Sequence, residues 1–239
     1  MEKKQNSLSL IIQNTMLSCL SYVKRPESRS SYSYKNLLQK GDGTITFFND
    51  RPQYITYYVN AVFVGDRSGS MSSMGSVPQE GATQFINKYK ELSEKYPDSI
   101  IHVTIYTFDN RIEKPFDDNA SNISQEHITK VYNSMIPRGC TKLFDTALTA
   151  IEDQQKQITE FKHHMKTNFS KEAQLLEPTI SSSFTLLTDG EDNMSFGTAT
   201  QLFNAIKTHE TLFNTTCFFA AANQDAMSAG DYYGFSQDN

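Results

Sequence analysis

Segments with the pattern of buried β-strands alternate with segments that have the pattern of amphipathic helices, and this alternation limits the possible folds more than any other feature. The strand-like segments are apolar and β-branched, and they cover 53–65, 99–108, 182–188 and 215–222. Between them, apolar residues recur every three or four positions, in the segments 78–96, 124–135, 142–158 and 199–210. This order predicts a doubly wound α/β fold, in which helices flank a mostly parallel sheet.

The first strand-like segment ends in a cluster of oxygen-bearing side chains. Asp66 follows it directly, and Ser68 and Ser70 come within the next four residues, with Gly69 between them allowing a tight turn. In a doubly wound sheet, ligands bind beyond the carboxyl ends of the strands, near the point where the strand order reverses. The cluster is therefore expected where such a fold binds ligands.

Two further oxygen donors are expected at the same edge of the sheet. Asp189 follows the segment 182–188, and Thr141 lies in a loop that leads into the segment 142–158. The complete set has two carboxylates and three hydroxyls: Asp66, Ser68, Ser70, Thr141 and Asp189. Oxygen ligands suit Mg²⁺, Mn²⁺ or Ca²⁺ and do not suit zinc or copper. The sequence therefore predicts a site for Mg²⁺, with Mn²⁺ or Ca²⁺ as alternatives.

The stretches DRSGS, GCT and LLTDGEDN, in this order, resemble the von Willebrand factor A (VWA) domain with its metal-ion-dependent adhesion site (MIDAS). The resemblance runs from about residue 55 to the end of the sequence. The residues of these motifs are most similar to those of intracellular and microbial members of the family. It implies a Rossmann-like fold with one short antiparallel strand. It also implies direct metal ligation by Ser68, Ser70 and commonly Thr141, whereas Asp66 and Asp189 would act largely through water or hydrogen bonds.

The resemblance further implies a function in binding proteins, in which an Asp or Glu side chain of a partner completes the metal shell. An enzymatic alternative is a Mg²⁺-dependent phosphohydrolase of the haloacid-dehalogenase-like type, which also places an Asp after its first strand. That chemistry needs an acid two residues after the nucleophile, and Ser68 occupies this position. A metal-free scaffold is the third possibility. We expect a metal-dependent protein-binding module with no catalytic residues.

Each candidate ligand also has a purely structural interpretation. Asp66 could form a turn after a strand, Thr141 could cap the helix that starts near Leu143, and Asp189 could belong to a tight turn with Gly190. Among the neighbouring acids, two are expected at the rim, and Asp145 is expected either on a helix face or as a hydrogen-bond acceptor behind the ligands. Arg67 is expected to point to solvent or to meet an acid of the partner. These neighbouring acids are Asp145, Glu191 and Asp192.

Composition limits the remaining classes of function and partner. The net charge is −5 with a pI of about 5.6, which gives no basic surface for nucleic acid and no attraction to anionic membranes. No apolar stretch reaches the roughly 18 residues that a transmembrane helix needs. Three widely spaced cysteines, Cys19, Cys140 and Cys217, indicate free thiols in a reducing, cytoplasmic compartment.

The first part of the chain is expected to be an extension of one VWA-like domain. Residues 1–52 are predicted to hold an amphipathic helix, a polar connector and the start of a hairpin, and residues 53–239 the domain. The helix is preferred to a signal peptide because polar residues interrupt its apolar stretch; its apolar face holds Leu8, Ile12, Met16 and Leu20. The sequence leaves the partner and the oligomeric state open.

Overall fold

The computed structural model describes residues 57–97, 99–167, 179–189, 192–221 and 230–235. The amphipathic helix, the polar connector and the start of the hairpin expected within 1–52 lie outside these described residues. Within the described part of the chain, no helix is both long enough and apolar enough to cross a bilayer.

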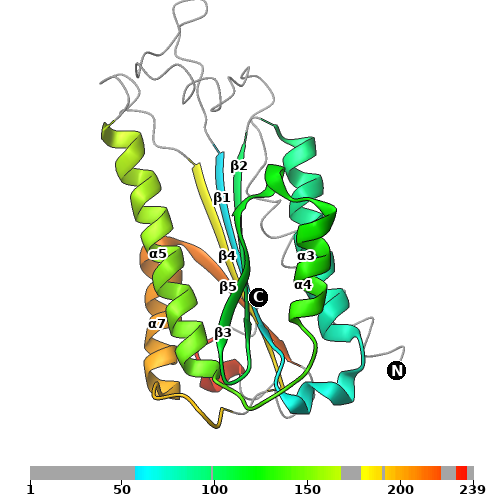
Figure 1. Cartoon of the computed structure of the whole chain (residues 1–239). Coiled ribbons are helices and arrows are strands. Elements are labelled where there is room, and N and C mark those ends of the chain that lie inside the picture. Colours follow the sequence, from blue (N-terminus) through cyan, green and yellow to red (C-terminus); the bar gives the residue numbers. More distant parts are fainter. Residues whose placement is uncertain (1–56, 98, 168–178, 190–191, 222–229, 236–239) are drawn as a thin grey trace, which may run out of the picture.

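Five strands form one sheet in the order β3-β2-β1-β4-β5 (Figure 1). Their bounds are β1 Tyr57–Asp66, β2 Ile100–Phe108, β3 Ile112–Asn119, β4 Thr179–Thr188 and β5 Thr215–Ala221. β1 is parallel to β2 and β4, β4 is parallel to β5, and β3 is antiparallel to β2. The structure therefore confirms the predicted α/β sheet, including a single antiparallel strand among the described ones.

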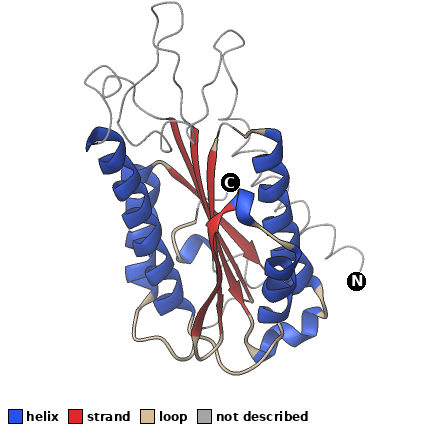
Figure 2. Cartoon of the chain, turned by 45° about the horizontal axis from the view of Figure 1, so that its top comes forward, coloured by secondary structure: helices blue, strands red, loops and turns tan. Residues whose placement is uncertain are grey.

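Helices cover both faces of this sheet (Figures 1 and 2). α3 and α4 lie on one face, and α5 and α7 lie on the other. Their bounds are α3 Val77–Lys95, α4 Gln125–Ser134, α5 Leu143–Thr167 and α7 Ala199–Phe213. Each matches a helical segment predicted from apolar spacing, and Ser124 caps α4 as predicted, since its Oγ accepts the N–H of His127 at 3.3 Å.

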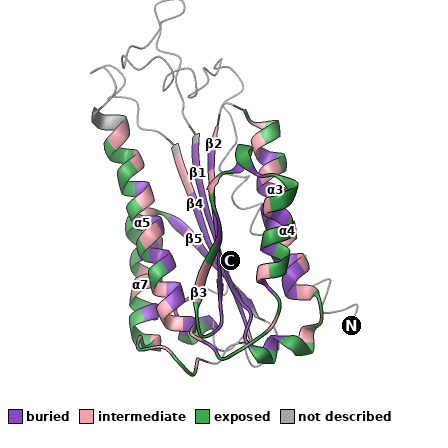
Figure 3. Ribbon diagram, in the orientation of Figure 1, coloured by how far each residue is buried: buried purple, intermediate pink, exposed green. Residues whose placement is uncertain are grey.

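The central strand is buried on both faces, as its continuous apolar sequence predicts (Figure 3). Ala61 and Phe63 pack into the core formed with α3 and α4. Val62 and Val64 point the other way and pack into the core formed with α5 and α7. Alternate residues of one strand thus join the two halves of the hydrophobic core.

Two buried polar side chains, Gln154 and His209, lie within this core beside β1. Gln154 of α5 donates to the carbonyl of Asn60 at 3.1 Å and to that of Ser183 at 3.0 Å, so α5 is anchored to two neighbouring strands. The Gln154 Oε1 atom lies 2.7 Å from Nε2 of His209, which is 0% exposed on α7. Because a carbonyl oxygen only accepts, the imidazole Nε2 carries the hydrogen. Burial lowers the pKa of His209 to about 4.

The position of β1 determines where a ligand can bind. β1 lies between β2 and β4, so the chain crosses to one side of β1 first and to its other side later. The carboxyl ends of β1 and β4 therefore flank the point at which the strand order reverses, where doubly wound sheets bind their ligands. Asp66 ends β1, and Asp189 follows the last residue of β4.

Candidate functional site

Asp66 joins the ends of the two central parallel strands. Its Oδ1 accepts the N–H of Ser68 at 2.7 Å, which closes a turn directly after β1. Its Oδ2 accepts the hydroxyl of Thr188, the last residue of β4, also at 2.7 Å. The side chain is 0% exposed. The turn that we considered as a structural role of Asp66 is thus present, together with a link to β4.

Burial raises the pKa of Asp66 to about 6, although its hydrogen bonds with Ser68 and Thr188 oppose this shift. The negative charge of Asp189 raises it further. Asp189 itself is half-buried, directly after β4. The charge of Asp189 thus acts on Asp66 across one edge of the sheet, as their strand positions predicted.

Ser68 and Ser70 present two hydroxyls beside this carboxylate. Their Oγ atoms lie 2.9 Å apart, with Ser68 buried and Ser70 exposed at the start of a short 3-10 helix, Gly69–Met74. Between them, the N–H of Gly69 donates to the carbonyl of Gly139 at 3.1 Å. This backbone bond brings the loop with the serines against the loop with Thr141.

The Thr141 loop bridges the β1 end and the segment after β4. The N–H of Arg138 donates to the carbonyl of Arg67 at 2.6 Å. Three residues later, the N–H of Thr141 donates to Oδ1 of Asn193 at 2.9 Å, and the Thr141 carbonyl accepts the N–H groups of Asn193 and Met194, both at 3.1 Å. Thr141 is buried at this junction. Contacts of one loop therefore bring the three chain segments that carry the predicted ligands to one place.

Thr141 does not cap α5, although its position before Leu143 allowed that interpretation. The first N–H groups of the helix donate to Asp192, with Oδ1 at 2.7 Å from the nitrogen of Leu143 and 3.4 Å from that of Phe144. The next N–H, of Asp145, donates to Oγ of Ser195 at 3.1 Å. The expectation that Asp192 is a rim charge was therefore incomplete, because this carboxylate caps a helix from a distant loop.

Asp145 acts as a hydrogen-bond acceptor, one of the two roles expected for it. Its Oδ1 accepts the N–H groups of Phe196 and Gly197 at 3.1 and 2.8 Å. These bonds fix the loop after β4 against the first turn of α5. Glu191, the other acid expected at the rim, lies outside the described residues.

Arg67 departs from its predicted position. Its side chain is 2% exposed and lies between two acids, where Nη1 donates to Oε2 of Glu113 at 2.8 Å and to the carbonyl of Ser134 at 3.0 Å. Nη2 and Nε make ion-pair contacts of 2.7 Å to Glu113 and 3.3 Å to Asp109, without hydrogen-bond alignment. Arg67 therefore points neither to solvent nor to a partner.

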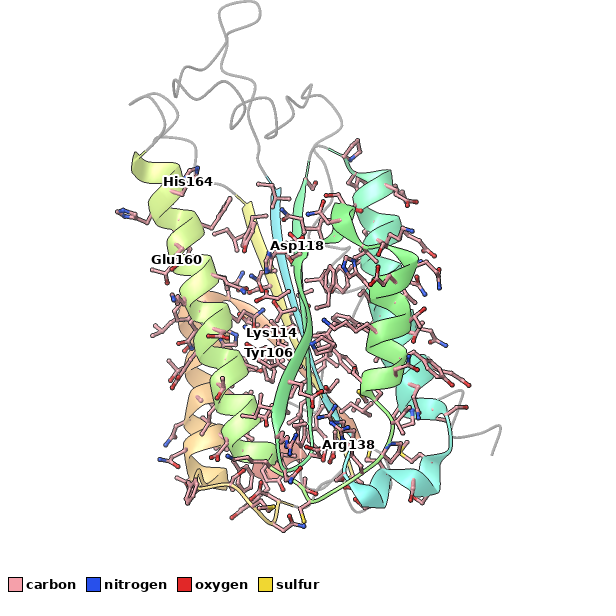
Figure 4. All side chains as sticks on the ribbon, viewed as in Figure 1. Tyr106, Lys114, Asp118, Arg138, Glu160 and His164 are labelled. Atoms are coloured by element: carbon pink, nitrogen blue, oxygen red, sulfur yellow. The ribbon has the colours of Figure 1, made fainter. Side chains whose placement is uncertain are left out.

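Sequence reasoning missed the other members of this charge cluster. Arg138 donates from Nε to Oδ2 of Asp109 at 2.7 Å and from Nη2 to Oε1 of Glu113 at 2.8 Å. Figure 4 places Arg138 at the end of the sheet opposite to His164. The sequence did contain one indication of this cluster. Asp109 directly follows the strand β2, so it stands at the same sheet edge as Asp66.

Apolar side chains are exposed on the loops that surround these ligands. Phe196 is 93% exposed, Ile136 is 52% exposed and Met194 is 46% exposed. Cys140 is also exposed and free, whereas Cys217 is free and buried. Within the described part of the chain, no three His, Cys, Asp or Glu side chains gather closely enough to hold a metal.

No protein-family model matches the chain, and no curated protein matches it. Solved structures do match. The vWF domain of the type V pili tip protein Mfa5 from Porphyromonas gingivalis is 15% identical, with 58% of this chain and 40% of that chain covered and a TM-score of 0.36. Manganese-loaded TRAP protein from Plasmodium vivax is 15% identical, with coverages of 76% and 65% and a TM-score of 0.44.

Proximal thread matrix protein 1 from the mussel byssus is 16% identical, with 74% of this chain and 45% of that chain covered and a TM-score of 0.39. This chain spans only 20% of a structure with three N-terminal domains of Mfa5. Similarities this distant do not identify a function.

Proposed function

We propose that this chain is a metal-dependent protein-binding module and not an enzyme. A divalent cation, Mg²⁺ or alternatively Mn²⁺ or Ca²⁺, is held at the carboxyl edge of the sheet by five side chains: Asp66, Ser68, Ser70, Thr141 and Asp189. The observation that carries the proposal is the convergence of three distant segments, because the loop of Ser68 and Ser70 is hydrogen-bonded both to the Thr141 loop and, through Asp66, to the end of β4.

The donor set fits a small hard cation. Neighbouring ligands of an octahedral ion, at metal–oxygen distances of about 2.0–2.1 Å, stand about 2.9 Å apart. The Oγ atoms of Ser68 and Ser70, which share a hydrogen bond in this structure, lie 2.9 Å apart, so a cation could replace this bond without separating them. Thr141 is buried at the same edge, and α5 is capped by Asp192, which leaves the Thr141 hydroxyl without a capping role.

The local charges also favour a cation. Asp66 is a buried carboxylate with a raised pKa, so a positive charge beside it would offset part of its desolvation cost. The nearest arginine in sequence, Arg67, directs its guanidinium to Glu113 and Asp109. When bound, the ion would supply a positive charge with an open coordination position for an anionic oxygen of a partner.

The surroundings of the site suit a protein partner. Phe196 exposes its ring while its backbone N–H is held by Asp145, so an aromatic side chain is presented on a fixed loop. Exposed aromatic and methionine side chains are enriched in protein interfaces, and a fixed loop reduces the entropy lost on binding. We infer that the partner presents an Asp or Glu beside apolar residues.

Selection of a random peptide library on the Mn²⁺-loaded protein tests this proposal. Enriched peptides should contain an Asp or Glu, should be released by a chelator, and should lose binding when that acid becomes Asn or Gln. The Asp66→Asn protein is the matched control and should retain none of them. Peptides that ignore chelator would argue for a metal-free scaffold, and turnover of p-nitrophenyl phosphate that Asp66→Asn abolishes would argue for a phosphohydrolase.

A further inference from the structure

The four charged side chains Arg67, Asp109, Glu113 and Arg138 form a cluster beside the proposed cation site, and we call it the arginine–acid cluster. Its members come from three places: the end of β1, the β2–β3 turn with the start of β3, and the loop before α5. Two arginines face two carboxylates, so the formal charge of the cluster is zero. Hydrogen bonds between these charges hold the pKa of Asp109 and that of Glu113 below their usual values, although burial opposes the shift.

Arg67 is placed to control the loop in which it lies. It stands between two of the proposed ligands, Asp66 and Ser68, yet its side chain turns away from them into the protein. Its own backbone is held on both sides, because its N–H donates to the carbonyl of Phe108 at 2.9 Å and its carbonyl accepts from Arg138 at 2.6 Å. The backbone bonds and the guanidinium contacts therefore fasten Arg67 at both ends of the residue, directly beside the serine hydroxyls.

Arg138 acts on the Thr141 loop in the same way. Its guanidinium bridges Asp109 and Glu113, the same two acids that Arg67 contacts. The carbonyl of Asp109 also accepts the N–H of Lys142 at 2.9 Å, directly after Thr141. Between these points, the positive φ of Gly139, 69°, lets the loop turn so that its carbonyl reaches Gly69.

We propose that Arg67 and Arg138 are positioning residues that hold the serine loop and the Thr141 loop in register, so that both halves of the cation site are preformed. This inference rests on the proposed metal-binding function. Neither arginine touches the ion. Both act through the shared acids Asp109 and Glu113 and through the backbone next to the ligands, one step further from the ion than the outer partners that hydrogen-bond metal ligands in other sites.

The test is a calorimetric titration of the chelator-stripped protein with Mg²⁺, Mn²⁺ and Ca²⁺, each as the metal alone. Arg67→Met keeps an unbranched apolar stem but removes the guanidinium and its charge, and the metal Kd should rise about 10–100-fold. Arg67→Lys should give a smaller rise in the metal Kd, because lysine retains the positive charge but lacks the forked donors of the guanidinium. The Arg138 side chain is 55% exposed, so Arg138→Gln is the safer substitution if Arg67→Met does not fold. It should also raise the metal Kd.

Two controls separate positioning from general stability. Arg111→Met removes an exposed arginine from the turn between β2 and β3 and should leave the Kd unchanged. Leu202→Ala removes a buried side chain on α7 and should lower the free energy of unfolding without changing the Kd.

The outcomes separate the two proposals. A wild-type Kd in both Arg67→Met and Arg138→Gln would overturn the positioning role and leave the cation site standing. A rise in the metal Kd of Leu202→Ala as large as that of the arginine variants would also overturn the positioning role, since metal affinity would then follow stability alone. If the wild type binds none of the three cations, the proposed function fails, and this inference fails with it.

Discussion

At the scale of single residues, two neighbours show how local surroundings decide the role of a charge. Asp66 and Arg67 are adjacent and both are buried, but they do not pair with each other. The Asp66 carboxylate accepts hydrogen bonds from uncharged groups and keeps a raised pKa, whereas the Arg67 guanidinium meets two acids. The charge of Asp66 thus lacks a cationic partner among the described residues and could accept one, whereas the charge of Arg67 is already balanced by carboxylates.

His209 should make stability depend on pH in a defined window. Burial lowers its folded pKa to about 4, from the unfolded value of 6.5. Between these two values the unfolded chain binds a proton that the folded chain does not, so the free energy of unfolding falls as the pH falls. The decrease in the free energy of unfolding due to His209 should reach about 3 kcal/mol near pH 4, and it should be absent above about pH 6.5.

Urea unfolding at several pH values, for wild type and His209→Gln, checks this prediction. Glutamine cannot take up the proton but can still bond Gln154, so the difference between the two proteins isolates the histidine from the carboxylates that titrate in both. The two stability curves should converge as the pH falls. Curves that stay parallel from pH 7 to pH 4 would show that His209 is not buried as described.

At the scale of elements, the helix α5 depends on a loop far away in the sequence. Asp192 accepts the N–H groups of Leu143 and Phe144, and its Oδ2 accepts the N–H of Ser195 at 3.1 Å. The cap therefore joins the start of α5 to the segment after β4. Both segments contribute to the edge of the sheet that holds the candidate site.

Asp192→Ala should accordingly destabilise the protein. Loss of a helix cap costs about 0.5–2 kcal/mol, and the loop of Ser195 also loses an anchor here, so we expect a value in the upper half of this range. Chemical denaturation in the presence of chelator measures the change without any contribution from metal. Glu152→Ala, an exposed acid further along α5, is the matched control and should change stability little. Equal effects of the two substitutions would contradict the capping role.

The same helix shows how far the sequence could predict the structure. Apolar spacing predicted α5 and likewise α3, α4 and α7, because the pattern is local to each element. The cap from Asp192 and the inward turn of Arg67 were not predictable, because they depend on β4 and β2 both lying beside β1. The closeness of the Asp66 and Asp189 ends was predictable despite their wide separation, because parallel strands place their carboxyl ends at one edge. The choice of all five ligands rested also on the resemblance of the motifs. Their role in binding metal stays a prediction.

At the scale of the whole molecule, the sheet brings together what the sequence separates. The order β2-β1-β4 places the carboxyl ends of three strands side by side, with the arginine–acid cluster on the β2 side of β1 and Asp189 on its β4 side. Helices on both faces fix the strands through two cores that share β1. A rigid edge of this kind suits a site whose ligands come from several loops.

The most direct test is thermal unfolding of the chelator-stripped protein, with Mg²⁺, Mn²⁺ or Ca²⁺ added back, for wild type and Asp66→Asn. A ligand at about 100 times its Kd stabilises by roughly 2.7 kcal/mol, which corresponds to a rise in Tm of roughly 5–10 °C at this size. We expect this rise in wild type and none in Asp66→Asn, which should remain folded because asparagine is nearly isosteric with aspartate. An equal rise in both proteins, or no rise in wild type with any of the three cations at saturating concentration, would contradict this expectation.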